Sequence, residues 1–138
     1  MEILNWPNNT CLVCGPEVAG GLRAVFAGGP DGVVANLVLP EFWQGFAGVA
    51  HGGVLAGLVD DAMWHAIYHF RALSTVTAEL TVRFHHPVAI GHPLVVRGRV
   101  SRFDRRLIRA EASIAENERV LVSATGRFMP GDPVRHHQ

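Results

Sequence analysis

Residues 51–70 read HGGVLAGLVDDAMWHAIYHF, and this stretch decides the fold. From Val54 to about Phe70 the sequence contains no proline and only one glycine, Gly57, which predicts a single long helix. Its apolar residues lie nearly all round the helix, a pattern that is typical of a buried helix. We therefore expect a central helix covered by the rest of the chain, on which the few polar side chains are the informative ones.

Segments on both sides of this helix have the pattern of β-strands. Before it, residues 22–27 and 33–39 flank the turn-rich stretch GGPDG, which predicts an antiparallel hairpin. After it, apolar and polar residues alternate from Thr75 onward, which predicts a long strand. Three more strands are expected at residues 94–103, 107–115 and 120–129, joined by short polar connections as antiparallel hairpins prefer.

This order of elements predicts an α+β fold. Two strands, one long helix and a four-strand antiparallel meander give a sheet of about six strands wrapped around one central helix, which is the hotdog arrangement. We expect a single domain over residues 1–138, with a leader at 1–20 and a frayed tail at 131–138.

Composition and charge exclude several classes of partner. Twelve basic residues balance twelve acidic ones, so the chain lacks the excess positive charge that is typical of proteins that bind nucleic acid or an anionic membrane. No stretch approaches the ~20 apolar residues that a membrane-spanning helix needs. The first residues, MEILNWP, lack the pattern of a signal peptide, so we expect a cytoplasmic protein. The 49% apolar content favours a subunit interface.

The only two cysteines, Cys11 and Cys14, form one C-x-x-C followed by Gly15. Such a pair supplies two of the four ligands of a structural zinc ion, and no second C-x-x-C completes a site. A redox motif would sit at a helix start after a strand, whereas this pair lies in a turn-rich leader. We expect a structural turn rather than a zinc or redox site, and we assign no metal.

Residues 44–63, QGFAGVAHGGVLAGLVDDAM, resemble hotdog-fold thioesterases of the PaaI-like group. The hallmark of that group is His-Gly-Gly at the start of the central helix and an acidic residue about two turns later. The Cys-x-x-Cys-Gly-Pro leader with its following Gly-Leu, residues 76–80 and residues 83–88 look similar too. The resemblance implies hydrolysis of a small-to-medium acyl- or aryl-acyl-CoA to free acid and CoA. It also implies a homodimer, or a dimer of dimers, with no cofactor beyond the CoA of the substrate.

The His-Gly-Gly and the acidic residue suggest how such a site works. Gly52 opens a helix whose first N–H groups lack partners, and a glycine lets a thioester carbonyl approach the backbone. Asp60 lies eight residues later, about 12 Å along a straight helix, so one subunit can hardly bring both to one acyl carbon. The resemblance implies that Asp60 of one subunit faces Gly52 of the other and acts as general base or nucleophile. The structural alternative is an Asp60 that caps a strand or pairs with an arginine.

Three further residues are catalytic candidates. Thr77 matches the position where relatives place a Ser or Thr that orients the attacking water, although Thr is also common in strands. His51 donates to the acyl carbonyl or merely caps the helix. Many relatives carry an Asn where this chain has Gly45, so Gln44 next to it is a candidate to serve instead.

The remaining candidates concern substrate and metal. Expected substrate-binding residues are Gly53, Gly57, Asp61, Trp64, Arg83, His85 and His86. Arg102, Arg105 and Arg106 are weaker candidates for the CoA phosphates. Asp61, His65 and His69 repeat every four residues and could bind a metal, but such spacing more often marks a polar stripe. A non-catalytic acyl-CoA binder or sensor is the alternative function, and the retained Asp60 carboxylate argues against it because it would repel an anionic ligand.

Overall fold

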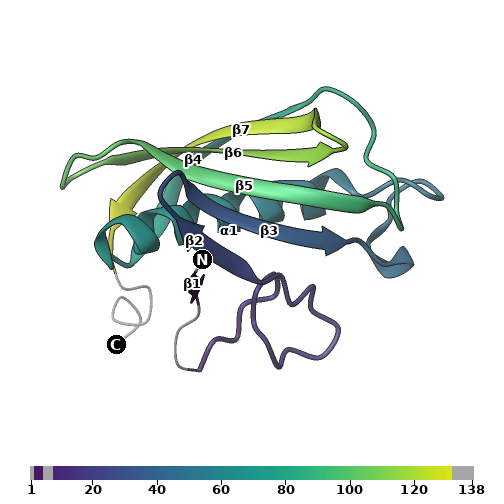
Figure 1. The fold of residues 1–138 in the computed structure, drawn as a ribbon, viewed down its shortest axis with the longest axis horizontal. Coiled ribbons are helices and arrows are strands. Elements are labelled where there is room, and N and C mark those ends of the chain that lie inside the picture. Colours follow the sequence, from purple (N-terminus) through teal and green to yellow (C-terminus); the bar gives the residue numbers. More distant parts are fainter. Residues whose placement is uncertain (1, 5–7, 132–138) are drawn as a thin grey trace.

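The computed structural model describes residues 2–4 and 8–131. One long helix, α1 (Gly52–Arg71), lies in the concave side of a curved antiparallel sheet (Figure 1). The predicted central helix and the hotdog arrangement are both confirmed. A short 3-10 helix, η1 (Glu41–Trp43), precedes α1. Among the described residues, no helix combines the length and the apolar character that crossing a bilayer requires.

Local capping explains where α1 begins and ends. The Nδ1 atom of His51 accepts a hydrogen bond from the Gly53 N–H, which satisfies one of the unpaired donors of the first turn. At the other end, Ala72 adopts the left-handed conformation with φ 52°, and its N–H donates to the Tyr68 carbonyl. The helix therefore starts two residues earlier than the apolar periodicity indicated.

The described sheet has seven strands rather than about six. They are β1 (Glu2–Leu4), β2 (Phe26–Gly29), β3 (Gly32–Val38), β4 (Thr75–Phe84), β5 (Pro93–Arg102), β6 (Ile108–Glu116) and β7 (Arg119–Pro130). Their order across the sheet is β1-β2-β3-β5-β6-β7-β4, and each pair is antiparallel. The additional strand comes from the leader, where β1 pairs with β2.

The predicted four-strand meander after the helix is wrong in one respect. β5, β6 and β7 follow one another in the sheet, but β4 pairs with β7, and β5 pairs with β3. The connection between β4 and β5 therefore takes the chain from the β7 side of the sheet to the β3 side. Two backbone hydrogen bonds join this connection to the loop before α1: the Ala50 N–H donates to the Val88 carbonyl and the Ile90 N–H to the Gly48 carbonyl. β4 thus becomes an edge strand of the sheet.

The first hairpin is also shorter than expected. Only Phe26 to Gly29 form β2, whereas two of the residues before it form hydrogen bonds with the leader instead. The Leu22 N–H donates to the Leu12 carbonyl and the Ala24 N–H to the Val13 carbonyl. The leader is therefore part of the folded structure and lies against the side of α1 that the sheet leaves uncovered.

Close packing between α1 and the sheet forms the core. Leu58, Val59, Met63 and Ile67 of α1 are fully buried. Gly98 of β5 marks the closest approach, because a Cβ at that position would lie 2.5 Å from the Ala62 carbonyl oxygen. The side of α1 that faces the leader is less covered than the apolar pattern suggested, since Gly57 and Asp61 there are only partly buried.

Replacing Gly98 by alanine should therefore destabilise the fold. The Cβ would force helix and sheet apart, and overpacking of this kind costs about 1–3 kcal/mol in the free energy of unfolding. Gly57→Ala is the matched control, because its Cβ would meet the Val13 side chain at an ordinary 3.7 Å. That change should be neutral or stabilising by up to about 1 kcal/mol through helix propensity. Chemical denaturation of both variants measures the difference, and equal stabilities would contradict the close approach.

Candidate active site

Asp60 projects from the middle of α1 toward the edge strand β4. Its Oδ1 atom accepts a hydrogen bond of 2.7 Å from the Thr77 hydroxyl. The Asp60 side chain is half-buried, and no arginine of the described chain forms an ion pair with it. Of the structural alternatives for Asp60, the arginine pair is thus absent. Thr77 therefore lies beside Asp60, and its predicted role of orienting the attacking water stays a prediction.

The surroundings of Asp60 change its proton affinity. Burial raises the pKa of the Asp60 carboxyl above its usual range, the hydrogen bond from Thr77 lowers it, and the negative charge of Asp61 raises it again. The net effect is a raised pKa. A carboxylate with raised proton affinity is a better base, which suits a group that takes a proton from water.

At the start of α1 only one of the two glycine N–H groups remains available. The Gly53 N–H donates to His51, while those of Val54 and Leu55 bond to the His51 carbonyl. The Gly52 N–H donates to none of the described residues and lies at the surface. Gly52 is exposed, so with the helix dipole behind it this donor can stabilise a negative charge that develops on a bound molecule.

Packing within the chain explains only one of the two glycines at the start of α1. A Cβ on Gly53 would lie 3.0 Å from Nδ1 of His51, so a side chain there would disturb the cap. A Cβ on Gly52 would meet only the Phe84 ring, at an ordinary 3.7 Å. The fold therefore explains Gly53, whereas packing within the chain does not require glycine at position 52.

His51 and Gln44 shape the approach to the helix. Since Nδ1 of His51 accepts the Gly53 N–H, the neutral ring carries its proton on Nε2, which remains a donor. The capping alternative for His51 is thus confirmed, and a contact with substrate stays a prediction. The Gln44 side-chain oxygen accepts the Gly48 N–H at 3.0 Å, so this side chain fixes the loop before His51.

Gly52 and Asp60 of one chain do not meet. They are eight residues apart on one helix, about 12 Å along its axis. Two hollows of about 550 Å³ each open on the described surface, one beside the β2–β3 turn and the outer face of β5 and β6, the other beside His86 and His92. Neither is lined by Gly52, Asp60 or Thr77.

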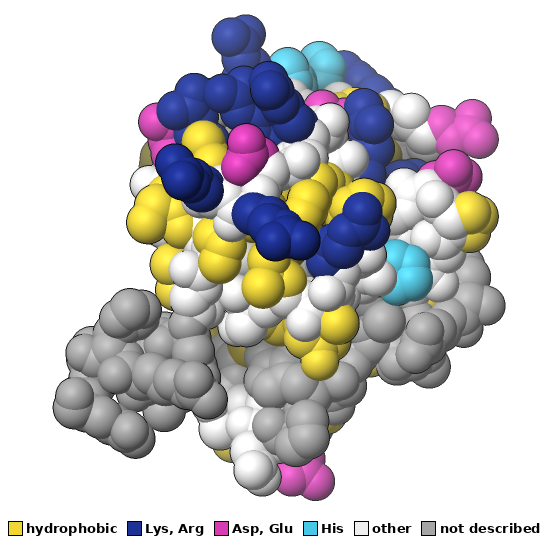
Figure 2. Space-filling model, turned by 90° about the vertical axis from the view of Figure 1, so that its left-hand side faces the viewer, with side chains coloured by type: hydrophobic (Ala, Val, Ile, Leu, Met, Phe, Trp, Pro, Cys, Tyr) yellow, Lys and Arg dark blue, Asp and Glu magenta, His cyan; other side chains and the backbone are white. Residues whose placement is uncertain are grey.

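The basic candidates for CoA binding lie at opposite ends of the sheet. Arg83 is the next-to-last residue of β4, and His85 and His86 follow the strand, near the start of α1, where Phe84 borders Gly52. The β5–β6 hairpin with Arg102, Arg105 and Arg106 lies beside the other end of β4. Figure 2 faces this hairpin end, where arginine side chains gather in the upper part of the view. The two groups therefore cannot act on one phosphate within a chain.

The histidines near the end of β4 already have partners. The Nε2 atom of His85 lies 2.7 Å from the Ser123 hydroxyl, and the His86 ring lies 3.0 Å from the Arg119 guanidinium. All three basic side chains of this group are exposed. Their role in binding CoA stays a prediction.

The substrate-binding candidates on α1 have separate surroundings. Trp64 is half-buried, donates from Nε1 to the Thr75 carbonyl and stacks on Tyr68. Gly57 faces Val13 of the leader. Asp61 points away from Asp60 and contacts Cys11 at 3.6 Å and His65 at 3.5 Å.

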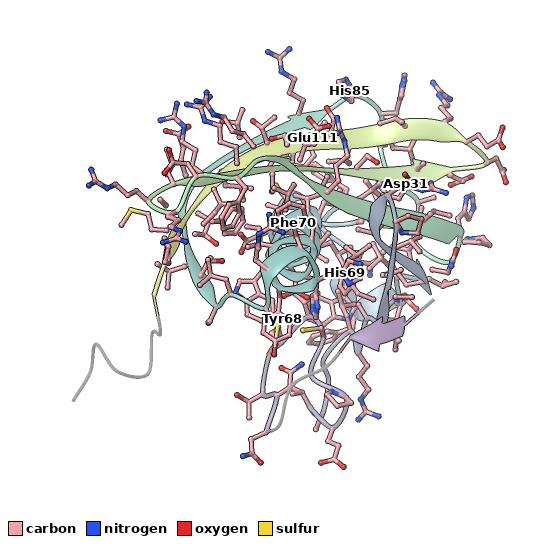
Figure 3. The ribbon with its side chains drawn as sticks, turned by 60° about the vertical axis from the view of Figure 1, so that its left-hand side comes forward. Asp31, Tyr68, His69, Phe70, His85 and Glu111 are labelled. Atoms are coloured by element: carbon pink, nitrogen blue, oxygen red, sulfur yellow. The ribbon has the colours of Figure 1, made fainter. Side chains whose placement is uncertain are left out.

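The stripe of Asp61, His65 and His69 does not form one cluster. The Nε2 atom of His69 lies 3.0 Å from the Gly29 carbonyl oxygen. Figure 3 shows His69 on the side of α1 toward the β2–β3 turn and Tyr68 pointing away from the sheet. Only Asp61 and His65 of the three are in contact.

Sequence reasoning missed that the cysteine pair and Asp61 come together. The structure places Cys11 and Cys14 against the middle of α1, within reach of Asp61, although 50 positions separate Cys11 from Asp61. A hydrogen bond from the Cys14 thiol is the main cause that lowers the pKa of Cys11 to about 7. The same bond and burial raise the pKa of Cys14. No signal in the spacing of residues indicates a contact across such a distance.

Comparison with known proteins identifies the family. The pattern described as the thioesterase superfamily matches residues 47–123, which is more than half of the chain and includes His51, Asp60 and Thr77. The chain belongs to the thioesterase superfamily. A Pseudomonas aeruginosa protein, PA0474, provisionally named an esterase, is 32% identical over 98 residues, which cover 70% of this chain and 73% of that protein.

Two solved structures share the fold of this chain. The thioesterase superfamily protein RHA08564 aligns with a TM-score of 0.80 and 31% identity, over 86% of this chain and 62% of that one, so this chain spans less than two thirds of its length. A Streptococcus pneumoniae protein described as a hypothetical thioesterase, solved with coenzyme A, aligns with a TM-score of 0.71 and 21% identity over 77% of this chain and 84% of that one. At this identity the second likeness shows the fold alone.

The hydrogen bond between Thr77 and Asp60 makes a prediction for this thioesterase superfamily member. Thr77→Val keeps the shape but removes the hydroxyl that stabilises the charged carboxylate, so the pKa of Asp60 should rise above its wild-type value. Thr77→Ser retains the hydroxyl and should leave this pKa close to wild type. Carbon-13 NMR titration of the carboxyl carbon measures both, and an unchanged pKa in the valine variant would show that the bond does not form.

Proposed function

We propose that this protein is an acyl-CoA thioesterase that hydrolyses a small-to-medium acyl- or aryl-acyl-CoA to the free acid and CoA. The observation that carries the proposal is the half-buried Asp60, held by Thr77, on a helix whose Gly52 N–H has no acceptor among the described residues. Membership of the thioesterase superfamily supports it. No cofactor besides the CoA of the substrate enters the proposal, and a cytoplasmic location stays a prediction.

Two fold relatives bear on the substrate. The Streptococcus pneumoniae thioesterase was solved with coenzyme A, which supports a CoA thioester as substrate. A protein of Ralstonia eutropha JMP134 is described as related to phenylacetic acid degradation and aligns with a TM-score of 0.73 and 22% identity over 83% of this chain and 90% of that one. Its name supports inclusion of aryl-acyl groups.

In the proposed reaction a water molecule attacks the acyl carbon. Asp60 takes the water's proton as general base, and Thr77 holds the carboxylate in place. The carbonyl oxygen gains negative charge and faces the Gly52 N–H. The bond from carbon to sulfur then breaks, and the CoA sulfur leaves with a proton. Direct attack by Asp60 as nucleophile uses the same residues, followed by hydrolysis of the acyl-enzyme.

The proposed enzyme is a homodimer, or a dimer of such dimers, in which two α1 helices lie side by side. Asp60 of one subunit then faces Gly52 of the partner subunit. Two features of the single chain support this. β4 is a ten-residue edge strand with mostly exposed side chains, an edge that proteins usually cover. Large apolar side chains near the start of α1 are also exposed, Phe46 by 88% and Phe84 by 54%.

Asp60→Asn should abolish most of the proposed activity. The amide keeps the shape but cannot accept a proton from water, so kcat should fall by about 10²–10⁴ with little change in folding. Thiol release from short, medium, long and aryl acyl-CoAs measures it. Asp61→Asn is the neighbouring comparison. Normal turnover by Asp60→Asn would show that Asp60 is not the catalytic carboxylate. A wild-type protein that releases no thiol from any of these substrates would disprove the proposed function.

The shared site can be tested by mixing two inactive variants. One carries Asp60→Asn; the other carries Gly52→Pro, which removes the proposed donor while fitting a first helical position. Neither homodimer should be active. In a mixed dimer one site collects both defects and the other none, so random pairing should restore roughly a quarter of wild-type activity. Mixed dimers that form but remain inactive would mean that each site is built within one chain.

A further inference from the structure

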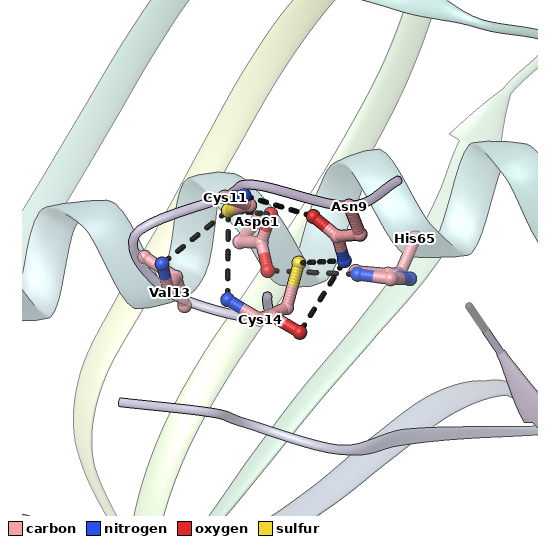
Figure 4. Close-up of polar contacts among 6 residues, drawn as sticks. All are labelled: Asn9, Cys11, Val13, Cys14, Asp61 and His65. Atoms are coloured by element: carbon pink, nitrogen blue, oxygen red, sulfur yellow. Dashed lines mark hydrogen bonds and ion pairs between the residues drawn. The ribbon is translucent and has the colours of Figure 1, made fainter. Parts of the chain in front are cut away.

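The leader folds a C-x-x-C loop onto the middle of α1. The sulfur atoms of Cys11 and Cys14 and a carboxylate oxygen of Asp61 all lie within 4.8 Å of one another (Figure 4). Cys14 is buried, and Cys11 and Asp61 are partly buried. Thiolate sulfur and carboxylate oxygen are both zinc ligands, and this separation is close to what one ion needs to bind all three.

The loop holds the Cys11 sulfur in a geometry that favours a thiolate. This sulfur accepts backbone N–H groups from Val13 at 3.3 Å and Cys14 at 3.5 Å. The Gly15 N–H closes the turn on the Cys11 carbonyl at 2.8 Å. Only glycine fits there, because a Cβ would lie 2.6 Å from that carbonyl oxygen and 2.4 Å from the Val18 side chain. The turn therefore directs both sulfurs to one side, toward α1.

Asn9 fixes the second sulfur. Its side-chain NH₂ donates to the Cys14 sulfur at 3.4 Å and to the Cys14 carbonyl at 3.3 Å, while its side-chain oxygen accepts the Cys11 N–H at 2.9 Å. Asn9 is itself buried. Hydrogen bonds of this kind, from the surroundings to the ligand atoms, orient the ligands of metal sites.

Asp61 completes the group from the helix side. One carboxylate oxygen contacts the Cys11 sulfur at 3.6 Å, and the other lies 3.5 Å from Nε2 of His65. His65 is 1% exposed and stacks on Phe26, so its ring cannot turn freely. No arginine of the described chain forms an ion pair with Asp61. Two thiols and a carboxylate thus converge where, within residues 2–4 and 8–131, the carboxylate has an ion pair with a histidine.

We propose that Cys11, Cys14 and Asp61 bind a zinc ion that fastens the leader to the central helix. Two thiols lose their protons to solvent as the ion binds, so the ion replaces two protons and no electron is transferred. His65 orients the carboxylate from outside the ligand set, and water takes the fourth position of the tetrahedron. The soft sulfur ligands favour zinc over magnesium or calcium.

This site is separate from the proposed chemistry. Asp61 turns toward the leader, whereas Asp60 turns toward β4. The ion would join two segments far apart in the sequence and contribute its binding free energy to the folded state. Its role is therefore structural, and its test does not require activity.

Metal binding can be measured on the full-length protein under reducing conditions, after treatment with a chelator. Zinc should bind at one ion per chain in competition with a chromophoric chelator. Cobalt in its place should give a thiolate-to-cobalt charge-transfer absorption, which histidines elsewhere in the chain do not produce. Cys11→Ser, Cys14→Ser and Asp61→Asn should each weaken binding by more than the roughly 10–100-fold typical of outer-shell changes. Asp60→Asn is the matched control and should bind zinc like wild type.

Each contrary result overturns the proposal. Wild-type protein without the charge-transfer absorption would place any bound ion at histidines, and equal zinc affinity of Asp61→Asn and Asp60→Asn would exclude the carboxylate. If the cysteine variants do not fold, two measurements on the wild-type protein still test the proposal. Zinc should protect both thiols from alkylation and raise the melting temperature. Thiols that react at the same rate with and without zinc would leave the loop as a structural turn only.

Discussion

The close packing of one helix against a curved sheet is the constraint on which the rest of this structure depends. Gly98 permits the approach, and the buried side chains of α1 prevent the helix from turning about its axis. Every polar group on α1 therefore has a fixed direction. The chemistry available to the protein follows from which residues point out of this packed interface.

The consecutive residues Asp60 and Asp61 illustrate how a fixed helix separates two tasks. Successive side chains on an α-helix point about 100° apart, so the first reaches the edge strand and the second reaches the leader. Asp60 meets a hydroxyl in a half-buried position open to water, whereas Asp61 meets two thiols and a buried histidine. The same residue type thus has a base-like environment at one position and a ligand-like environment at the next.

Periodicity and turn residues were enough to predict the helix and most strand positions, and the placement of Thr77 near Asp60 followed from the family resemblance. These depend on local pattern or on a resemblance that already contains the pairing. Pattern failed where the partner lies far away in the sequence. Nothing in the local sequence indicates that β4 pairs with β7 rather than with β5. The connection from β4 to β5 is held by backbone hydrogen bonds between residues 48–50 and residues 88–90, which are far apart in the sequence.

The regular spacing of Asp61, His65 and His69 was of limited use for a related reason. Helical spacing places side chains on one face but says nothing of what that face touches. His69 reaches a turn carbonyl, while Asp61 reaches a cysteine 50 positions earlier. The C-x-x-C segment of the leader was predicted to be a turn, and it forms one, but its position against α1 is a tertiary contact that composition and spacing do not contain.

The edge position of β4 links the proposed catalysis to the proposed assembly. Thr77 holds Asp60 from a strand that has a neighbour, β7, on one side only. In the proposed dimer a second copy covers this uncovered side, so the same contact that completes the site with Gly52 also reduces the access of water to Asp60. Further burial strengthens the cause that already raises the pKa of Asp60. Assembly would then supply both the missing donor and a stronger base, which gives a physical reason for a thioesterase site to be divided between two chains.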